Sequence, residues 1–158
     1  MNSLSVAVSG DGHTKAVEPA VLIAEDDEND VFLLRRVAAK ASLSIPLVFV
    51  RDGQEAIEYL KIASTTGSFP QLVLLDLKMP KYGGLEVLQW IREQPSLKRL
   101  VVIIFTASEL EADINRAYDL RANSYLLKPA DPDDLVTLLD QIQSYWLQAN
   151  RFPELRNT

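Results

Sequence analysis

The sequence predicts a doubly wound α/β domain, in which a five-stranded parallel sheet carries helices on both faces. Five short apolar runs alternate along the chain with five segments whose apolar residues recur every three or four positions. The runs are continuously apolar, as in strands that are buried on both sides. They lie about 20 to 30 residues apart, which leaves room for the right-handed helical crossovers that join parallel strands.

Composition excludes several classes of protein. The 158 residues suffice for one domain and a tail, and a net charge of −6 argues against a nucleic-acid-binding face. The chain has no cysteine and only one histidine, His13, so disulfides, thiolate chemistry and histidine-rich zinc sites are not expected. No apolar run approaches the length of a membrane span, and residues 1–8 do not resemble a signal peptide, so we expect a cytoplasmic protein.

The first half of the chain contains two predicted strand–helix units. Acids follow the first strand, as the positive end of a helix dipole favours, and Asp27 and Asp30 are interpreted as helix-capping residues. Val31, Leu34 and Val37 then have helical spacing. The expected elements are a strand over 20–24, a helix over 28–41, a strand over 46–50, a helix around 56–63 and a loop over 64–70.

The third strand, over 72–75, is the centre of the prediction. It ends at Asp76, and Pro80 cannot continue a central strand, so the chain must turn there. Asp76 is therefore placed at the carboxyl end of a strand, where open α/β sheets bind their ligands.

The second half repeats the same alternation. Asp131 and Pro132 are typical of a helix start. The expected elements are a helix over 85–92, a strand over 100–105, a helix over 109–120, a strand over 123–127 and a helix from 131 to about 146. We therefore divide the chain into an N-terminal tail (1–18), one domain (19–147) and a C-terminal tail (148–158).

Four predicted strands end in polar residues that belong together chemically. Glu25 and Asp26 follow the first strand, Asp76 the third, Thr106 the fourth and Lys128 the fifth. If the first, third and fourth strands are neighbours, these groups meet at one edge of the sheet. Converging carboxylates repel unless a cation is present, and Mg²⁺ prefers such oxygen ligands.

The same set of residues predicts phosphoryl chemistry. A lysine and a hydroxyl beside an acidic metal site suit a phosphoryl group better than a neutral ligand. Asp76 has no second acid beside it, so it is the candidate nucleophile that would form an aspartyl phosphate. The metal and Lys128 would compensate the charge of the transferred group.

In these motifs the sequence resembles the receiver domain of two-component response regulators, with a flavodoxin-like (βα)5 fold. The resemblance covers about residues 21–146 and rests on Glu25-Asp26, Leu74-Leu75-Asp76-Leu77-Lys78-Met79-Pro80, Thr106-Ala107 and Lys128-Pro129. It implies phosphorylation of Asp76 by a sensor histidine kinase, with self-catalysed phosphotransfer and autodephosphorylation but no enzymatic turnover.

The resemblance also implies a role for each site residue. Asp26 and Asp76 would bind Mg²⁺ directly, Glu25 largely through water, and Lys78 through its backbone carbonyl. Thr106 and the aromatic Tyr125 would form the switch. Ala107 and Ser108 would border the phosphate site, and Lys78 itself stands where many relatives have Asn, Arg or Glu.

Only about 30 residues follow Lys128, so we expect a single-domain regulator without a DNA-binding output domain. The loop over 64–70 and the C-terminal aromatic residues resemble regulators that pair with bacterial phytochrome kinases. Tyr145, Trp146 and Phe152 either pack onto their own domain or form an apolar patch that joins two copies through the last helix and tail. The downstream target or phosphotransfer protein is not indicated by the sequence.

Three other functions share this architecture. A metal-dependent nuclease would need a second acid two residues after Asp76, where the chain has Lys78. A flavodoxin-like cofactor binder would need a phosphate loop after the first strand, where Glu25 and its neighbours would repel phosphate. A pseudo-receiver would lack an essential site residue, and none is missing.

Overall fold

Five parallel strands form one sheet in the order β2-β1-β3-β4-β5, which confirms the predicted fold class. The computed structural model describes residues 20–41, 43 and 45–156, so the predicted N-terminal tail lies outside the described residues. The strands are β1 (Val21–Ala24), β2 (Leu47–Val50), β3 (Leu72–Leu75), β4 (Val101–Thr106) and β5 (Ser124–Leu127). The helices are α1 (Glu28–Lys40), α2 (Gly53–Thr66), α3 (Gly84–Glu93), α4 (Glu111–Asp119) and α5 (Pro132–Ile142), followed by the π-helical segment η1 (Gln143–Ala149).

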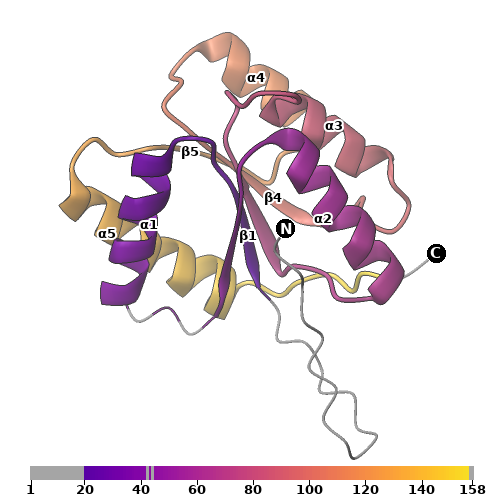
Figure 1. The fold of residues 1–158 in the computed structure, drawn as a ribbon, viewed down its shortest axis with the longest axis horizontal. Coiled ribbons are helices and arrows are strands. Elements are labelled where there is room, and N and C mark those ends of the chain that lie inside the picture. The colour runs from indigo at the N-terminus through magenta and orange to yellow at the C-terminus, as the bar shows by residue number, and fades with distance from the viewer. Residues whose placement is uncertain (1–19, 42, 44, 157–158) are drawn as a thin grey trace, which may run out of the picture.

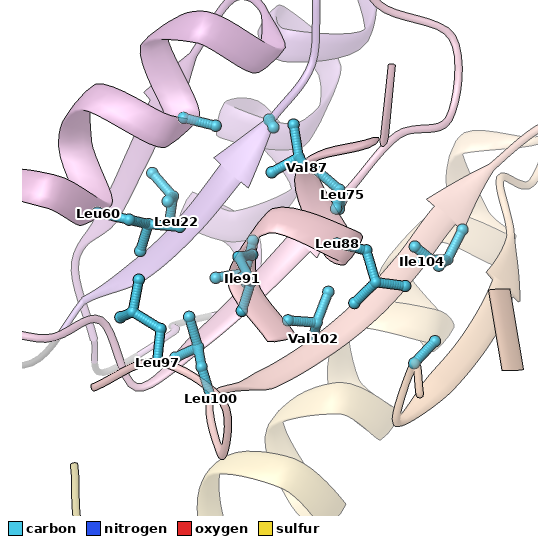
Figure 2. Packing of buried hydrophobic residues seen from close by; sticks show 14 of the residues in the cluster. Leu22, Leu60, Leu75, Val87, Leu88, Ile91, Leu97, Leu100, Val102 and Ile104 are labelled. Atoms are coloured by element: carbon cyan, nitrogen blue, oxygen red, sulfur yellow. The ribbon is translucent and has the colours of Figure 1, made fainter. Parts of the chain in front are cut away.

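The helices cover both faces of the sheet, as Figure 1 shows. Helices α1 and α5 pack on one face against residues such as Ile23, Leu74 and Ile103. Helices α2, α3 and α4 pack on the other, where alternate residues of the same strands meet the α3 side chains of Leu88 and Ile91 (Figure 2). Because both faces of the central strands β1 and β3 and of β4 up to Phe105 are buried, these stretches are apolar at every position, and this produced the continuous runs in the sequence.

Side-chain caps fix where three of the helices begin. Asp27 accepts hydrogen bonds from the backbone N–H groups of Asn29 and Asp30, at 2.8 and 3.1 Å, so the capping interpretation of Asp27 is right. Asp52 caps α2 in the same way, and Asp131 caps α5. These caps occupy the loops after the carboxyl ends of the strands and orient the helices that follow.

The last helix is shorter than predicted. Regular α-helix ends at Ile142, and η1 carries Trp146 onto the core face of α1 and α5. Tyr145 is 58% exposed and meets the Trp146 ring edge-on, with the ring centroids 5.1 Å apart. Trp146 therefore packs onto its own domain.

The segment after η1 continues to contact the domain beyond the predicted boundary at residue 147. Phe152 packs against the core on the α1 and α5 side, whereas Leu155 packs against the core on the opposite side. Between them the chain borders a small crevice, together with Gln71 before β3 and Val101 at the start of β4. Residues 150–156 thus connect the two faces across the edge of the sheet that lies opposite the strand ends bearing the acids.

None of the helices within the described ranges has the length and apolarity needed to cross a membrane.

Candidate phosphoacceptor and metal site

The register of the sheet brings the predicted site residues to one edge. Ala24 of β1 pairs with Leu75 of β3, so Glu25 and Asp76 follow neighbouring positions. The Asp76 N–H donates to the carbonyl of Ala24 at 3.2 Å. On the other side of β3, β4 ends at Thr106, whose carbonyl accepts from the Lys128 N–H at 2.8 Å.

Lys128 is at the centre of the site. Its ammonium donates to Asp76 Oδ2 at 2.7 Å, to Asp30 Oδ2 at 3.1 Å, and over a very short distance to Glu25 Oε2. An ammonium has three N–H donors, so these three carboxylates satisfy it fully. The side chains of Glu25 and Asp76 are only 2% and 9% exposed, so these ion pairs are shielded from water.

Three acids form a group that could hold a metal ion. One carboxylate oxygen from each of Glu25, Asp26 and Asp76 lies within 4.8 Å of the other two. Asp26 is exposed, whereas the other two are buried. The set contains only oxygen donors and no cysteine or histidine, and such donors fit a hard divalent ion such as Mg²⁺.

Glu25 and Lys128 have pKa values that the site shifts from their ordinary values. Burial raises the pKa of Glu25 to about 7, although the hydrogen bond from Lys128 limits the rise. Burial also opposes the charge on Lys128, but the hydrogen bonds to Asp76 and Glu25 outweigh it, so the pKa of Lys128 is raised. The ammonium therefore stays charged at any physiological pH, while Glu25 titrates near neutrality.

The other predicted residues line the mouth of the site. Thr106 is buried, and its hydroxyl oxygen lies 3.4 Å from the N–H of Ser108. The Ser108 hydroxyl donates to Asp113 of α4 at 2.5 Å, and the Tyr125 hydroxyl donates to the Ser108 carbonyl at 2.8 Å. The predicted switch pair, Thr106 and Tyr125, is thus linked through Ser108, while Ala107 is exposed beside them.

The loop between β3 and α3 packs closely beneath Asp76. A Cβ atom on Gly84 would lie 2.1 Å from the Asp76 carbonyl oxygen, and one on Gly53 would lie 2.1 Å from that of Tyr82. Both positions therefore require glycine because backbone fills the space of a side chain. Lys78 is exposed on this loop, with its N–H 3.4 Å from Asp76 Oδ1, and the metal-binding role of its carbonyl stays a prediction.

Two acids of this region were not predicted correctly. Asp30 was interpreted as a capping acid, but its carboxylate binds Lys128 instead. Asp113 was not singled out, and it holds Ser108. Both residues lie in the first turn of a helix, where an acid is equally well explained by the helix dipole, so the sequence offers no signal that distinguishes the roles.

The sheet and this edge define a receiver domain of two-component signalling. The model of the response regulator receiver domain family matches residues 21–140, and the chain therefore belongs to that family. Receiver domains are phosphoacceptor signalling proteins rather than conventional enzymes.

Similar proteins narrow this assignment. The chain is 35% identical over 135 residues to the response regulator Rcp1 of Synechocystis, covering 84% of this chain and 92% of Rcp1. It is 37% identical over 134 residues to the probable methanogenesis regulatory protein FilR2 of Methanothrix harundinacea, covering 84% and 86%. The predicted resemblance to phytochrome-associated regulators is confirmed by the similarity to the cyanobacterial phytochrome response regulator RcpA, described next.

Two solved structures are similar to the structure of this chain. The phosphorylated cyanobacterial phytochrome response regulator RcpA superimposes with a TM-score of 0.79 at 35% identity, covering 87% of this chain and all of that one. The Mn²⁺-bound form of Rcp1 has a TM-score of 0.76 at 35% identity, covering 86% and 99%. Divalent-metal binding is thus a property of a close relative, and the acidic cluster provides suitable ligands here.

Proposed function

We propose that this chain accepts a phosphoryl group on Asp76 from a phosphohistidine of a sensor histidine kinase and changes a partner-binding surface in response. The observation that carries the proposal is the arrangement at Asp76. Its carboxylate is nearly buried at the end of β3, contacts the Lys128 ammonium at 2.7 Å, and belongs to an acidic group of metal-ligand type.

In the transfer, a carboxylate oxygen of Asp76 attacks phosphorus and forms an O–P bond. The N–P bond of the phosphohistidine breaks, and the imidazole nitrogen leaves with the electron pair. Lys128 is placed to neutralise negative charge on the phosphoryl oxygens. Thr106 ends β4, the strand next to β3, and its hydroxyl would donate to the new phosphoryl group after moving toward it.

Mg²⁺ is the proposed cofactor. Asp26 and Asp76 would bind it directly, Glu25 largely through water, and the Lys78 carbonyl would complete the protein ligands. When bound, the ion supplies positive charge that compensates the phosphoryl oxygens. Asp26 is the exposed member of the group, so water molecules can also bind the ion there, and Mg²⁺ usually keeps several water ligands.

The response would spread through Thr106 and Tyr125 to the surface of α4, β5 and α5. Ser108 connects the two switch residues, and its link to Asp113 ties this loop to α4. Leu110, before α4, and Leu127, at the end of β5, are 64% and 41% exposed and offer apolar contacts to a partner.

We further propose a bacterial phytochrome as the kinase, because the similar regulator RcpA is a cyanobacterial phytochrome response regulator. We also propose the cytoplasm as the location. A homodimer through the last helix and the C-terminal segment remains our proposal. Tyr145 is the aromatic residue that stays largely exposed there. Light scattering at high micromolar concentration, with and without a phosphate mimic, should detect a dimer, and a monomer in both conditions would contradict it.

Phosphorylation itself is tested with acetyl phosphate and Mg²⁺. Mass spectrometry should show the addition of one phosphoryl group to the wild type and to an Asp119→Asn control, which removes an exposed acid away from the site. Asp76→Asn should abolish the gain. An unchanged gain in Asp76→Asn, or none in the wild type, would refute the assignment.

A further inference from the structure

Asp30 is the acid of the Lys128 cluster that lies outside the candidate metal group. Glu25 and Asp76 belong both to the set that binds Lys128 and to the set that could bind metal. Asp30 contacts Lys128 at 3.1 Å but is not a member of the metal group. Its position is fixed because the Asp27 side chain accepts from the Asp30 N–H and anchors the first turn of α1.

Lys128 and a bound metal ion would compete for the same carboxylates once the site holds metal and a phosphoryl group. A divalent ion bound directly by Asp76 and through water by Glu25 draws on two of the carboxylates that hold the ammonium, and two cations at close range repel each other. Once Asp76 carries a phosphoryl group, its carboxylate charge is lost as well. Of the three carboxylates that contact Lys128, Asp30 is then the one that neither the metal ion nor the phosphoryl group engages, so it can keep the ammonium at the site.

We propose that Asp30 is a positioning residue, which holds the Lys128 ammonium beside Asp76 while metal and phosphoryl group occupy the other carboxylates. This inference rests on the proposed phosphorylation of Asp76. Asp30 reaches the ammonium from the first turn of α1, whereas Glu25 and Asp76 reach it from the ends of β1 and β3. Its side chain is 43% exposed, which limits its energetic cost in the free protein.

Removing Asp30 should change the rate of phosphorylation in opposite directions, depending on whether Asp30 positions Lys128 or acts only as a nearby negative charge. If Asp30 acted only as a negative charge near the site, its removal would favour an anionic phosphodonor, and phosphorylation would be faster. If it positions Lys128, removal leaves the ammonium poorly placed, and phosphorylation is slower. The direction of the change therefore distinguishes the two roles.

The test is the initial rate of phosphorylation by acetyl phosphate with saturating Mg²⁺, measured by mass spectrometry on the full chain. Asp30→Asn should lower the rate about tenfold, the size expected for losing one hydrogen bond to a charged group. Glu28→Gln is the matched control, because Glu28 is exposed in the same helical turn and its carboxylate contacts no charged group among the described residues. It should stay within about twofold of wild type, since exposed charges are screened.

Asp30→Glu provides the rescue, because it restores a carboxylate at the same position, and it should recover most of the rate. Circular dichroism of each variant confirms that equal amounts of folded protein are compared. The proposal is overturned if Asp30→Asn matches Glu28→Gln, if it is faster than wild type, or if Asp30→Glu is as slow as Asp30→Asn. A wild type that takes up no phosphoryl group would instead refute the proposed function on which this inference depends.

Discussion

Replacing Glu25 by Gln should stabilise the metal-free protein at alkaline pH, although Glu25 forms an ion pair with Lys128. The Glu25 side chain is 2% exposed, and burial raises its pKa to about 7 from 4.5, the value of an unperturbed Glu. The pKa of about 7 already includes the attraction of Lys128, which lowers the pKa of Glu25. Burial of the charged carboxylate therefore costs more than the ion pair returns.

The magnitude follows from proton linkage. The folded protein binds the Glu25 proton more tightly than the unfolded chain, so the unfolding free energy falls as pH rises through the window from 4.5 to about 7. At about 1.4 kcal/mol for each tenfold change in proton affinity, the loss at pH 8.5 is about 3 kcal/mol. Gln cannot ionise, so Glu25→Gln escapes this loss. Its advantage should shrink to about 1 kcal/mol at pH 5.5.

The assay is urea unfolding followed by circular dichroism at pH 5.5 and pH 8.5, with a chelator to remove divalent ions. Glu28→Gln controls for the removal of one acid near the start of α1, and it should not differ from wild type at either pH. A saturating divalent ion should reduce the advantage of Glu25→Gln, because it stabilises the ionised wild type. If Glu25→Gln is less stable than wild type at pH 8.5, or if its effect does not depend on pH, the reasoning is wrong.

Three further changes test the framework around the site. Arg92→Met should lower the unfolding free energy by about 2 to 4 kcal/mol in urea titrations, because it removes hydrogen bonds from the guanidinium. The guanidinium donates to the carbonyls of residues 98, 100 and 121 and to the side chain of Asn123. An effect below about 0.5 kcal/mol would contradict this prediction. Gly84→Ala should slow phosphorylation by acetyl phosphate and lower the unfolding free energy by about 1 to 3 kcal/mol, because the new methyl group collides with the Asp76 carbonyl. An unchanged rate would show that the backbone shifts to make room for the methyl group. Phe152→Ala should lower the melting temperature by several degrees, because removing a half-buried aromatic ring costs about 2 kcal/mol of unfolding free energy. Arg151→Ala, which changes an exposed side chain, should leave the melting temperature unchanged. Equal effects of the two changes would show that Phe152 does not pack against the core.

The fold could be predicted from the sequence because burial on both faces makes the strands continuously apolar. The geometry of parallel sheets, whose strands all end at one edge, was then enough to place four polar residues together: Glu25, Asp76, Thr106 and Lys128. What the sequence left open was strand order, since the convergence of the acids depends on β1 and β3 being neighbours. The family resemblance supplied the individual roles.

Features that depend on tertiary docking could not be predicted. Asp30 has the sequence context of a helix cap, and only the rotation of α1 against the loop after β5 turns its carboxylate toward Lys128. The packing of Phe152 and Leu155 on opposite faces depends on where η1 ends. The periodicity of α5 continues through Trp146, so it could not reveal the change to a π-helical segment.

The strand order also explains why the basic residue of this site must be long. Glu25 and Asp76 follow adjacent strands, but Lys128 follows β5, which is separated from β3 by β4. Neighbouring strands lie about 4.8 Å apart, so the backbone of residue 128 is about 10 Å from that of residue 76 across the sheet. An extended lysine covers much of that distance with a flexible apolar stem and ends in a compact charge. Its ammonium can therefore contact acids from β1, β3 and α1 together, and the length of this side chain, rather than proximity of the backbones, assembles the site.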